Sequence, residues 1–388
     1  MNAEIFAALL CGICARSRIV PDRPLRWTII TNPQAGGFTI RARWKKHRAM
    51  LEASLKKAEL TPPRPDSGPS LTARQADGSL GAYGLIPTTG AGHAETITGA
   101  LVDEIRSGLG SGGDRQNTRG KTAPFHLIIT AGGDGTSREV QAALFSAPAL
   151  VRSNCAVLRL PMGTGNDGAD AAELDRALEL LIAPASVHWA GALRLTTAAP
   201  GKGPFLAFNI LSIGLDAFVT HMTNRMKGRL PGDSYKLWVD IAALLYDRIY
   251  RVGPMDLRIF DRKGREQQSF RETVLLLAVG ESGRRTYGSR KKILPDDRNV
   301  CLLRQMPLWR KMALKELFNT GAHVDKPEAR LFNAGRVEFR GEYPILAQMD
   351  GETVLLGPED FPGTIEVIEK VIPVLKPKSG ETQSQGSS

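Results

Sequence analysis

Two glycine-rich turns are the segments of this chain best suited to chemistry. They read GGDGT over residues 132–136 and PMGTGND over residues 161–167, and each follows an apolar run and precedes a helical pattern. Glycine leaves no Cβ where a phosphate chain must approach the backbone. The helix that follows offers free N–H groups and the positive end of its dipole to an anion. Both turns are therefore predicted to bind phosphate groups.

The first turn also carries a carboxylate, Asp134. A carboxylate repels phosphate, so Asp134 suits a Mg²⁺ ion or a substrate hydroxyl better than direct phosphate binding. A purely structural Asp-Gly turn is the alternative, because such turns are common. The second turn, with the same ingredients, favours function over that alternative.

The elements that must position these turns follow one repeated pattern of strand, turn and helix. Apolar runs at 126–130 and 155–160 precede the two turns, and helical patterns follow them. An earlier strand at 27–31 ends at Asn32-Pro33, and helices are expected at about 39–60 and 94–105. Strands that alternate with helices predict a parallel sheet, whose carboxyl edge binds ligands in open α/β folds. Both turns should therefore lie at one edge.

The second half of the chain has a different pattern of predicted secondary structure. Apolar strands are expected at 188–196, 204–211, 255–260 and 272–279, with one long helix near 235–250. We expect an α/β domain over 24–186 and a β-rich domain over 187–356, with 357–375 as a candidate return to the first. Residues 1–23 are interpreted as a leader and 376–388 as a disordered polar tail. The segments 61–84 and 107–121 are interpreted as insertions or flexible loops.

Composition narrows the class of protein. The 388 residues suffice for two cores, and no apolar run approaches the ~18 residues of a membrane span. The net charge of +11 favours polyanionic surroundings, but no nucleic-acid-binding module accompanies it. Four cysteines fit a reducing cytoplasm rather than a disulfide framework, and the six histidines show no metal-ligand spacing.

Several motifs in register resemble one family. Asn32-Pro33-x-x-Gly36, GGDGT and Pro-x-Gly-Thr-x-Asn-Asp, in this order, look like the catalytic domain of diacylglycerol, sphingosine and ceramide kinases and their bacterial lipid-kinase relatives. The segment from Thr88 to Ala94, Gly214-Leu-Asp-Ala217 and Asp350-Gly-Glu352 also fit. The resemblance covers about residues 25–372.

The resemblance implies an N-terminal nucleotide-binding α/β domain, with a parallel sheet and flanking helices, and a C-terminal β-sandwich, with ATP in the cleft between them. It implies a cytoplasmic, peripherally membrane-associated lipid kinase that uses ATP and Mg²⁺ on a lipid hydroxyl, at an anionic membrane surface. Glu352, or Asp350 beside it, would deprotonate that hydroxyl, and Asp134 is a competing candidate. The residues implied around the nucleotide are Asn32, Pro33, Gly36, Thr88, Gly132, Gly133, Gly135, Thr136, Glu139, Gly163, Thr164, Asn166 and Asp167.

The chain departs from the family pattern where relatives carry an Asp-Gly pair that holds a structural Mg²⁺. Residues 295–302 lack that pair, so the metal site is either absent or rebuilt from Asp296 and Asp297. Two other functions stay open: a non-catalytic lipid- or nucleotide-binding protein, and a soluble-substrate kinase of the NAD kinase type. The second glycine turn and Asp350-Gly-Glu352 favour the lipid branch. The sequence indicates neither the lipid nor the oligomeric state.

An aromatic residue among basic neighbours leaves one further choice open. Leu308-Trp309 precedes Arg310 and Lys311. The pair either reaches a bilayer interface, with the cations at the headgroups, or is buried in the sandwich.

Overall fold

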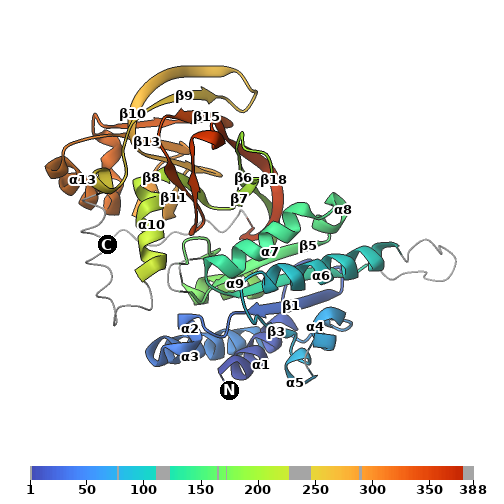
Figure 1. Ribbon diagram of the computed structural model, residues 1–388. Coiled ribbons are helices and arrows are strands. Elements are labelled where there is room, and N and C mark those ends of the chain that lie inside the picture. The colour runs from blue at the N-terminus through green and yellow to red at the C-terminus, as the bar shows by residue number, and fades with distance from the viewer. Residues whose placement is uncertain are drawn as a thin grey trace. The chain divides into compact units, whose positions relative to one another are not determined.

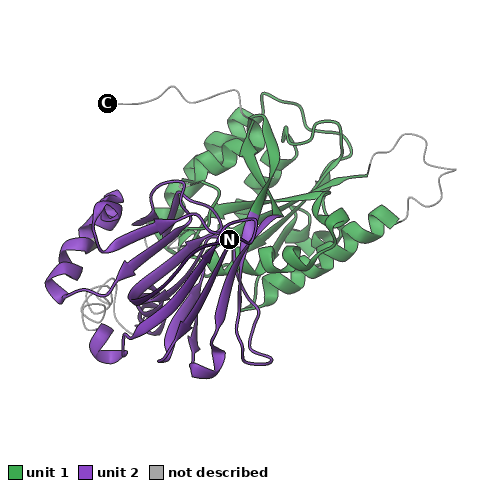
Figure 2. Cartoon of the chain, turned by 90° about the horizontal axis from the view of Figure 1, so that it is seen from above, with its two compact units in different colours: residues 1–190, 371–388 green, residues 191–370 purple. Residues whose placement is uncertain are grey.

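The computed structural model describes residues 2–76, 78–110, 123–163, 166–171, 173–226, 246–287 and 291–378. The chain forms two compact units, coloured separately in Figure 2. Unit 1 comprises Met1–Ala190 and Val371–Ser388, and unit 2 comprises Gly191–Lys370. Each unit has a hydrophobic core of its own.

Unit 1 is built on a parallel sheet in the order β3-β1-β4-β5, as the alternation of strands and helices predicts. Leu127 pairs with Trp27 of one neighbouring strand and with Ala156 of the other. Val374 pairs in parallel with Val157, so the end of the chain adds a strand beside β5. The strands are β1 (Leu25–Thr31), β2 (Gly68–Pro69), β3 (Leu85–Pro87), β4 (Phe125–Gly132), β5 (Cys155–Pro161) and the last part of β18 (Gly363–Pro377), whose first part belongs to unit 2.

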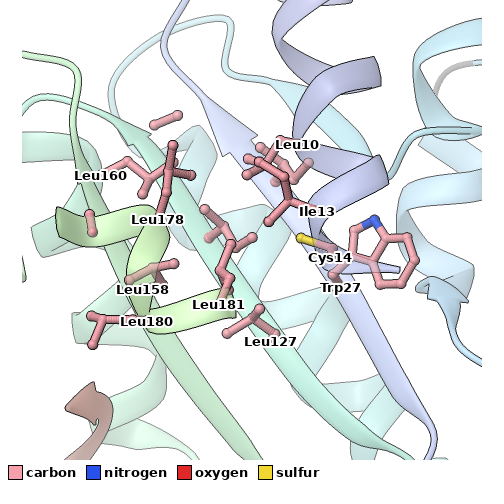
Figure 3. Packing of buried hydrophobic residues seen from close by; sticks show 14 of the residues in the cluster. Leu10, Ile13, Cys14, Trp27, Leu127, Leu158, Leu160, Leu178, Leu180 and Leu181 are labelled. Carbon is pink, nitrogen blue, oxygen red and sulfur yellow. The ribbon is translucent and has the colours of Figure 1, made fainter. Parts of the chain in front are cut away.

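Helices cover both faces of this sheet, which explains why its strands are apolar on both sides. In Figure 1, α1 (Asn2–Cys14) and α3 (Arg41–Ala58) lie on one side of β1, and α6 (His93–Gly110) and α7 (Asp134–Ser146) lie on the other. Leucines of α9 (Leu174–Ile182) complete the first side. Figure 3 shows Leu178 and Leu181 against Leu127 and Leu158.

The N-terminal segment differs from the sequence-based interpretation, which set residues 1–23 apart from the domain. Helix α1 is almost entirely apolar, and its Phe6, Leu10 and Ile13 are fully buried in the core of unit 1. The thiols of Cys11 and Cys14 are free, and burial raises both pKa values. A helix with this much buried apolar surface is part of the packing of unit 1.

The segment 61–84 is also more ordered than the predicted flexible loop. It contains β2, α4 (Leu71–Ala76) and α5 (Gly78–Gly81), and Glu104 accepts hydrogen bonds from the backbone N–H groups of Leu71 and Thr72 at the start of α4. The interpreted linker 107–121 begins inside α6, and its residues 111–121 lie outside the described residues. Short helices α2 (Gly36–Thr39) and α8 (Ala149–Arg152) complete unit 1.

Unit 2 is formed largely by antiparallel strands, which confirms the predicted β-rich second half. The long β10 bends between two layers, because residues 266–273 pair with β9 and residues 274–280 pair with β8 and β13. The strands are β6 (Ala185–Thr196), which enters from unit 1, β7 (Phe205–Ala207), β8 (Ile210–Gly214), β9 (Pro254–Phe260), β10 (Glu266–Gly280), β11 (Arg285–Tyr287), β12 (Lys291–Leu294), β13 (Val300–Arg304), β14 (Ala329–Phe332), β15 (Arg336–Gly341), β16 (Ile345–Met349) and β17 (Glu352–Leu356).

Alternation along β10 divides its side chains between two cores. Leu277 and Val279 lie in the core between the layers, while Leu276 and Ala278 lie in a second core under the helices. This is the two-residue period of a strand covered on both faces. The helices of unit 2 are α10 (Leu215–Met226), α12 (Tyr246–Ile249) and α13 (Leu308–Thr320), with 3-10 turns η2 (Ala322–Asp325) and η3 (Pro358–Asp360).

Most of the helix predicted near 235–250 lies outside the described residues, which resume at Tyr246 with α12. Across the part of the chain that the structure describes, every helix is too short or too polar to span a bilayer.

Unit 1 should lose stability in mild acid because of His126 in β4. Burial lowers the pKa of His126 from 6.5 to about 4, and the charge of Glu104 only partly opposes this shift. His126 therefore becomes protonated below pH 6.5 in the unfolded chain, but only below about pH 4 in the folded chain. We expect a loss of about 2 kcal/mol of unfolding free energy between pH 7.5 and pH 5.

Urea unfolding at the two pH values measures this loss. His126→Asn should flatten the pH dependence, because asparagine does not titrate. His188→Asn, at an exposed position, should keep the wild-type dependence. If the unfolding free energies of His126→Asn and wild type changed equally between the two pH values, His126 would not be the cause of the loss.

Candidate functional site

The first glycine turn joins β4 to α7. Gly133 is the N-cap of the helix, with φ −91° and ψ −174°, and no side chain caps the helix start. The first amides of a helix have no partner within the helix, so they are available to an anion. A hydrogen bond of 2.9 Å between the hydroxyls of Thr130 and Ser137 ties the end of the strand to the first turn of the helix.

The second glycine turn packs directly against the first. A Cβ added to Gly163 would lie 2.5 Å from the Cα of Gly133, closer than real side chains come. The Asn166 side chain closes the second turn, since it accepts from the Gly163 N–H at 2.7 Å and donates to the Gly163 carbonyl at 3.1 Å. Thr164 lies outside the described residues.

Asp134 links the two turns. Its carboxylate accepts a hydrogen bond of 3.0 Å from the N–H of Gly168, just past the second turn. The half-buried Asp167 precedes Gly168 in the same turn. Asp134 therefore has a structural role that the sequence did not indicate, in addition to any part in binding or catalysis.

The loop after β1 reaches the same place. The side chain of Asn32 accepts a hydrogen bond from the Gln34 N–H at 2.9 Å, which forms the turn that contains Pro33. The N–H of Gly37, next to Gly36, donates to the Met162 carbonyl at 2.8 Å. The structure thus brings the loops after β1, β4 and β5 together at the carboxyl edge of the parallel sheet.

Three other predicted nucleotide contacts lie around this edge. The N–H of Thr88 donates to the Thr31 carbonyl at 2.7 Å, which places Thr88 at the end of β3. The Thr136 side chain is buried against Gly132. Glu139 accepts from the N–H groups of Gly92 and Ala94 at 2.8 and 3.1 Å, so it holds the start of α6. These contacts make Glu139 a support for the loop that follows Thr88.

Asp350, in unit 2, fastens a tight turn. Its carboxylate accepts backbone N–H groups of Phe208, Asn209 and Ile210 at 2.5, 3.1 and 3.0 Å. The residue has φ 48°, a left-handed conformation that aspartate tolerates better than most residues. Because these bonds occupy its lone pairs, Asp350 is better suited to positioning than to accepting a proton.

A buried polar network supports the same turn. Gln348 is fully buried, accepts from the Gly351 N–H at 3.0 Å and donates to the Ser212 hydroxyl at 2.9 Å. Ser212 in turn donates to Asp216, at the start of α10, at 2.6 Å. The sequence analysis missed Gln348, although its place two residues before Asp350 was a usable signal.

Glu352 is the more exposed carboxylate of the Asp-Gly-Glu segment. It begins β17 and pairs with Met349 across the hairpin, so its backbone is fixed while its side chain faces solvent. Of the two acidic residues in this segment, Glu352 is therefore the exposed one, and Asp350 is the one held by backbone N–H groups.

The two carboxylates suggested for a rebuilt metal site are both held by arginines. Asp297 pairs with Arg284 at 2.7 Å, and Asp296 pairs with Arg298. The hydrogen bonds from these arginines lower the pKa of both carboxyls. No group of three or more His, Cys, Asp or Glu side chains arranged to hold a metal ion occurs among the described residues.

Comparison with known proteins supports one family over part of the chain. The model of the diacylglycerol kinase catalytic domain matches residues 112–189. This segment contains both glycine turns, and the resemblance predicted from them is confirmed there. The Asn32-Pro33 loop and the Asp350-Gly-Glu352 segment lie outside the match. No curated protein matches the sequence.

Solved structures support the fold along nearly the whole chain. A crystal structure of a proposed diacylglycerol kinase from Bacillus anthracis str. Sterne is 17% identical, with a TM-score of 0.54 over 90% of this chain and 94% of that one. A second proposed diacylglycerol kinase from the same strain is 16% identical, with a TM-score of 0.51 over 92% and 98%. At such identities the likeness is one of fold: a parallel α/β part followed by antiparallel strands.

The contact between the glycine turns predicts opposite results for two alanine substitutions. Gly163→Ala should lower the unfolding free energy by about 2 kcal/mol, because its Cβ meets backbone that cannot move aside. Gly135→Ala should not lower stability, since no atom lies within 4 Å of its Cβ and alanine is the better helix former. Urea unfolding gives the stabilities.

Calorimetric ATP titration of the same two proteins completes this test. If the triphosphate lies against α7, the added methyl of Gly135→Ala should weaken ATP binding about tenfold while the fold is kept. Wild-type ATP affinity in a stable Gly135→Ala protein would place the nucleotide elsewhere.

Asp350→Asn tests the positioning role of this carboxylate. An amide oxygen can replace only part of three charge-assisted hydrogen bonds, so unit 2 should lose about 2 kcal/mol of stability. Asp297→Asn is the matched control, because that side chain is 82% exposed, and its unfolding midpoint should equal that of wild type. An unchanged unfolding midpoint for Asp350→Asn would show that the three hydrogen bonds do not stabilise unit 2.

Proposed function

We propose that this protein is an ATP-dependent lipid kinase that transfers the γ-phosphoryl group of ATP to the hydroxyl of a diacylglycerol or sphingoid-like lipid. The observation that carries the proposal is the contact between Gly133 and Gly163 at the carboxyl edge of the parallel sheet. The absence of Cβ atoms where the turns meet leaves the start of α7, with its first backbone N–H groups, uncapped by a side chain, which suits a chain of phosphates. The family match over residues 112–189 adds independent support for this use.

The reaction requires a base for the lipid hydroxyl. The hydroxyl oxygen attacks the γ-phosphorus and forms the new P–O bond, while the bond to the bridging oxygen breaks and ADP leaves. A carboxylate near the attacking oxygen takes the hydroxyl proton. Glu352 is our candidate, because Asp350 is occupied by three backbone N–H groups.

Mg²⁺ fits this proposal as a companion of the nucleotide. The ion is commonly held by one or two carboxylates, water and substrate phosphates, rather than by a cage of protein ligands. In unit 1, Asp134 lies between the two glycine turns and is the carboxylate best placed to share such an ion. When bound, Mg²⁺ would neutralise charge on the phosphates. A separate structural site at Asp296 and Asp297 is not supported by their pairing with arginines.

The acceptor implies a membrane partner. Diacylglycerols and ceramides reside in bilayers, so the enzyme would work at a membrane surface, and the chain's charge of +11 suits an anionic one. A cytoplasmic, peripherally associated enzyme in lipid metabolism is therefore part of the proposal.

One observation favours a second candidate, a lipid- or nucleotide-binding protein without turnover. Asp296 and Asp297 stand in the segment that lacks the family's Asp-Gly pair, and they are paired with Arg298 and Arg284. A binding protein would take up ATP or lipid and release it unchanged.

Phosphate transfer from labelled ATP to a panel of diacylglycerol, monoacylglycerol, sphingosine and ceramide tests the proposal, with NAD as the soluble acceptor. We expect a labelled lipid, and a rate about 10²–10⁴ times lower for Glu352→Gln. Glu359→Gln, at a nearby exposed carboxylate, should retain wild-type rates. Binding of ATP without any labelled product would favour the second candidate, and labelled NAD would favour the soluble-substrate kinase.

A further inference from the structure

Helix α13 exposes apolar side chains at its start. Leu308, Trp309 and Met312 are 46%, 67% and 56% exposed. Residues three and four apart share a helix face, so the three side chains form one surface, here called the α13 patch. Single exposed hydrophobic residues are ordinary, but a tryptophan grouped with two large aliphatic side chains on one turn marks an interaction site.

The rest of the helix holds this patch outward. Lys311 is 4% exposed, and its ammonium group lies 3.0 Å from Asp247 of α12. Leu314 is buried in the core under the helices, and Arg310 pairs with Glu328 at 2.5 Å. Because these contacts fix the orientation of α13, the patch cannot turn inward without breaking a buried ion pair.

Basic residues lie near the patch in the sequence, but six of those within residues 284–320 are held in ion pairs: Arg284, Arg285, Arg298, Arg304, Arg310 and Lys311. Residues 284–320 contain ten Lys and Arg but three Asp and Glu. The exposed Lys292 on β12 lies near the other end of the helix, where a Cβ on Gly321 would come 3.6 Å from its Cβ. The chain keeps a net charge of +11 after every ion pair has cancelled. The positive charge of the whole chain therefore favours an anionic partner, and the exposed apolar side chains of the patch favour one with an apolar layer.

We infer that the α13 patch is the element by which unit 2 contacts an anionic lipid bilayer. Leu308, Trp309 and Met312 enter the interfacial layer, and the positive charge of the chain attracts it to the anionic surface. Tryptophan suits this depth because its ring is apolar and its N–H stays near water. The inference rests on the proposed function, which requires a lipid acceptor, and adds the surface that brings the enzyme to it.

Sedimentation of the full chain with vesicles of phosphatidylglycerol and phosphatidylcholine tests the inference, in the absence of ATP. Trp309→Ser should reduce the vesicle partition coefficient about tenfold, because it removes the largest inserted side chain. Trp189→Ser is the matched control, since that tryptophan is 40% exposed and lies in unit 1. Its partition should equal that of wild type, and added salt should weaken binding of both.

A second measurement separates failure of this surface from failure of the proposed activity. Phosphorylation of a short-chain diacylglycerol in solution should be equal for wild type and Trp309→Ser, because α13 is not part of the candidate catalytic site. Reduced vesicle binding with this activity intact supports the inference. If vesicle binding depends on Trp309 but the protein transfers no phosphate, the membrane-binding surface is supported and the proposed kinase activity is wrong.

Two outcomes would overturn the inference itself. One is equal vesicle partition of Trp309→Ser and wild type. The other is a wild-type dimer, measured by light scattering, that Trp309→Ser converts to a monomer while vesicle binding is unchanged. In that case the patch would bind a second copy of the chain.

Discussion

The approach of two backbones, at Gly133 and Gly163, is the constraint on which the site in unit 1 depends. Side chains at these positions would collide, so both turns must be free of Cβ atoms where they meet. The approach also requires β4 and β5 to be adjacent, parallel and in register, with Gly132 opposite Pro161. Burial of both sheet faces under helices supplies the stability that holds this register.

The acidic residues of the two units show how little a residue type alone says about its role. Asp134 bridges two turns through the Gly168 N–H, and Asp350 fastens a left-handed turn through three backbone N–H groups. Glu352, two residues later, presents its side chain to solvent. All three are carboxylates in short glycine-containing motifs, yet they differ in exposure and in the backbone N–H groups that they accept.

Ion pairing likewise limits what the net charge of +11 says about a partner. Arg284 and Arg298 contribute to that charge, but they pair with Asp297 and Asp296. Lys311 is buried against Asp247 and serves to orient α13. Only the charge that remains after these local ion pairs is available to a partner. The exposed apolar residues of α13 therefore indicate the surface for a partner better than a count of cations does.

The sequence by itself determined the alternation of strands and helices in unit 1, the β-rich unit 2 and the two glycine turns, because each is encoded in a few neighbouring residues. It did not reveal that α1 belongs to the core, that residues 61–84 form short helices, or that Glu139 supports a loop. It also left the burial of Trp309 open. These features rest on contacts between distant parts of the chain: Asp350 meets the Phe208 N–H across 142 positions. Local patterns carry no record of such a partner, so only tertiary packing decides which side chains are held in place and which remain exposed.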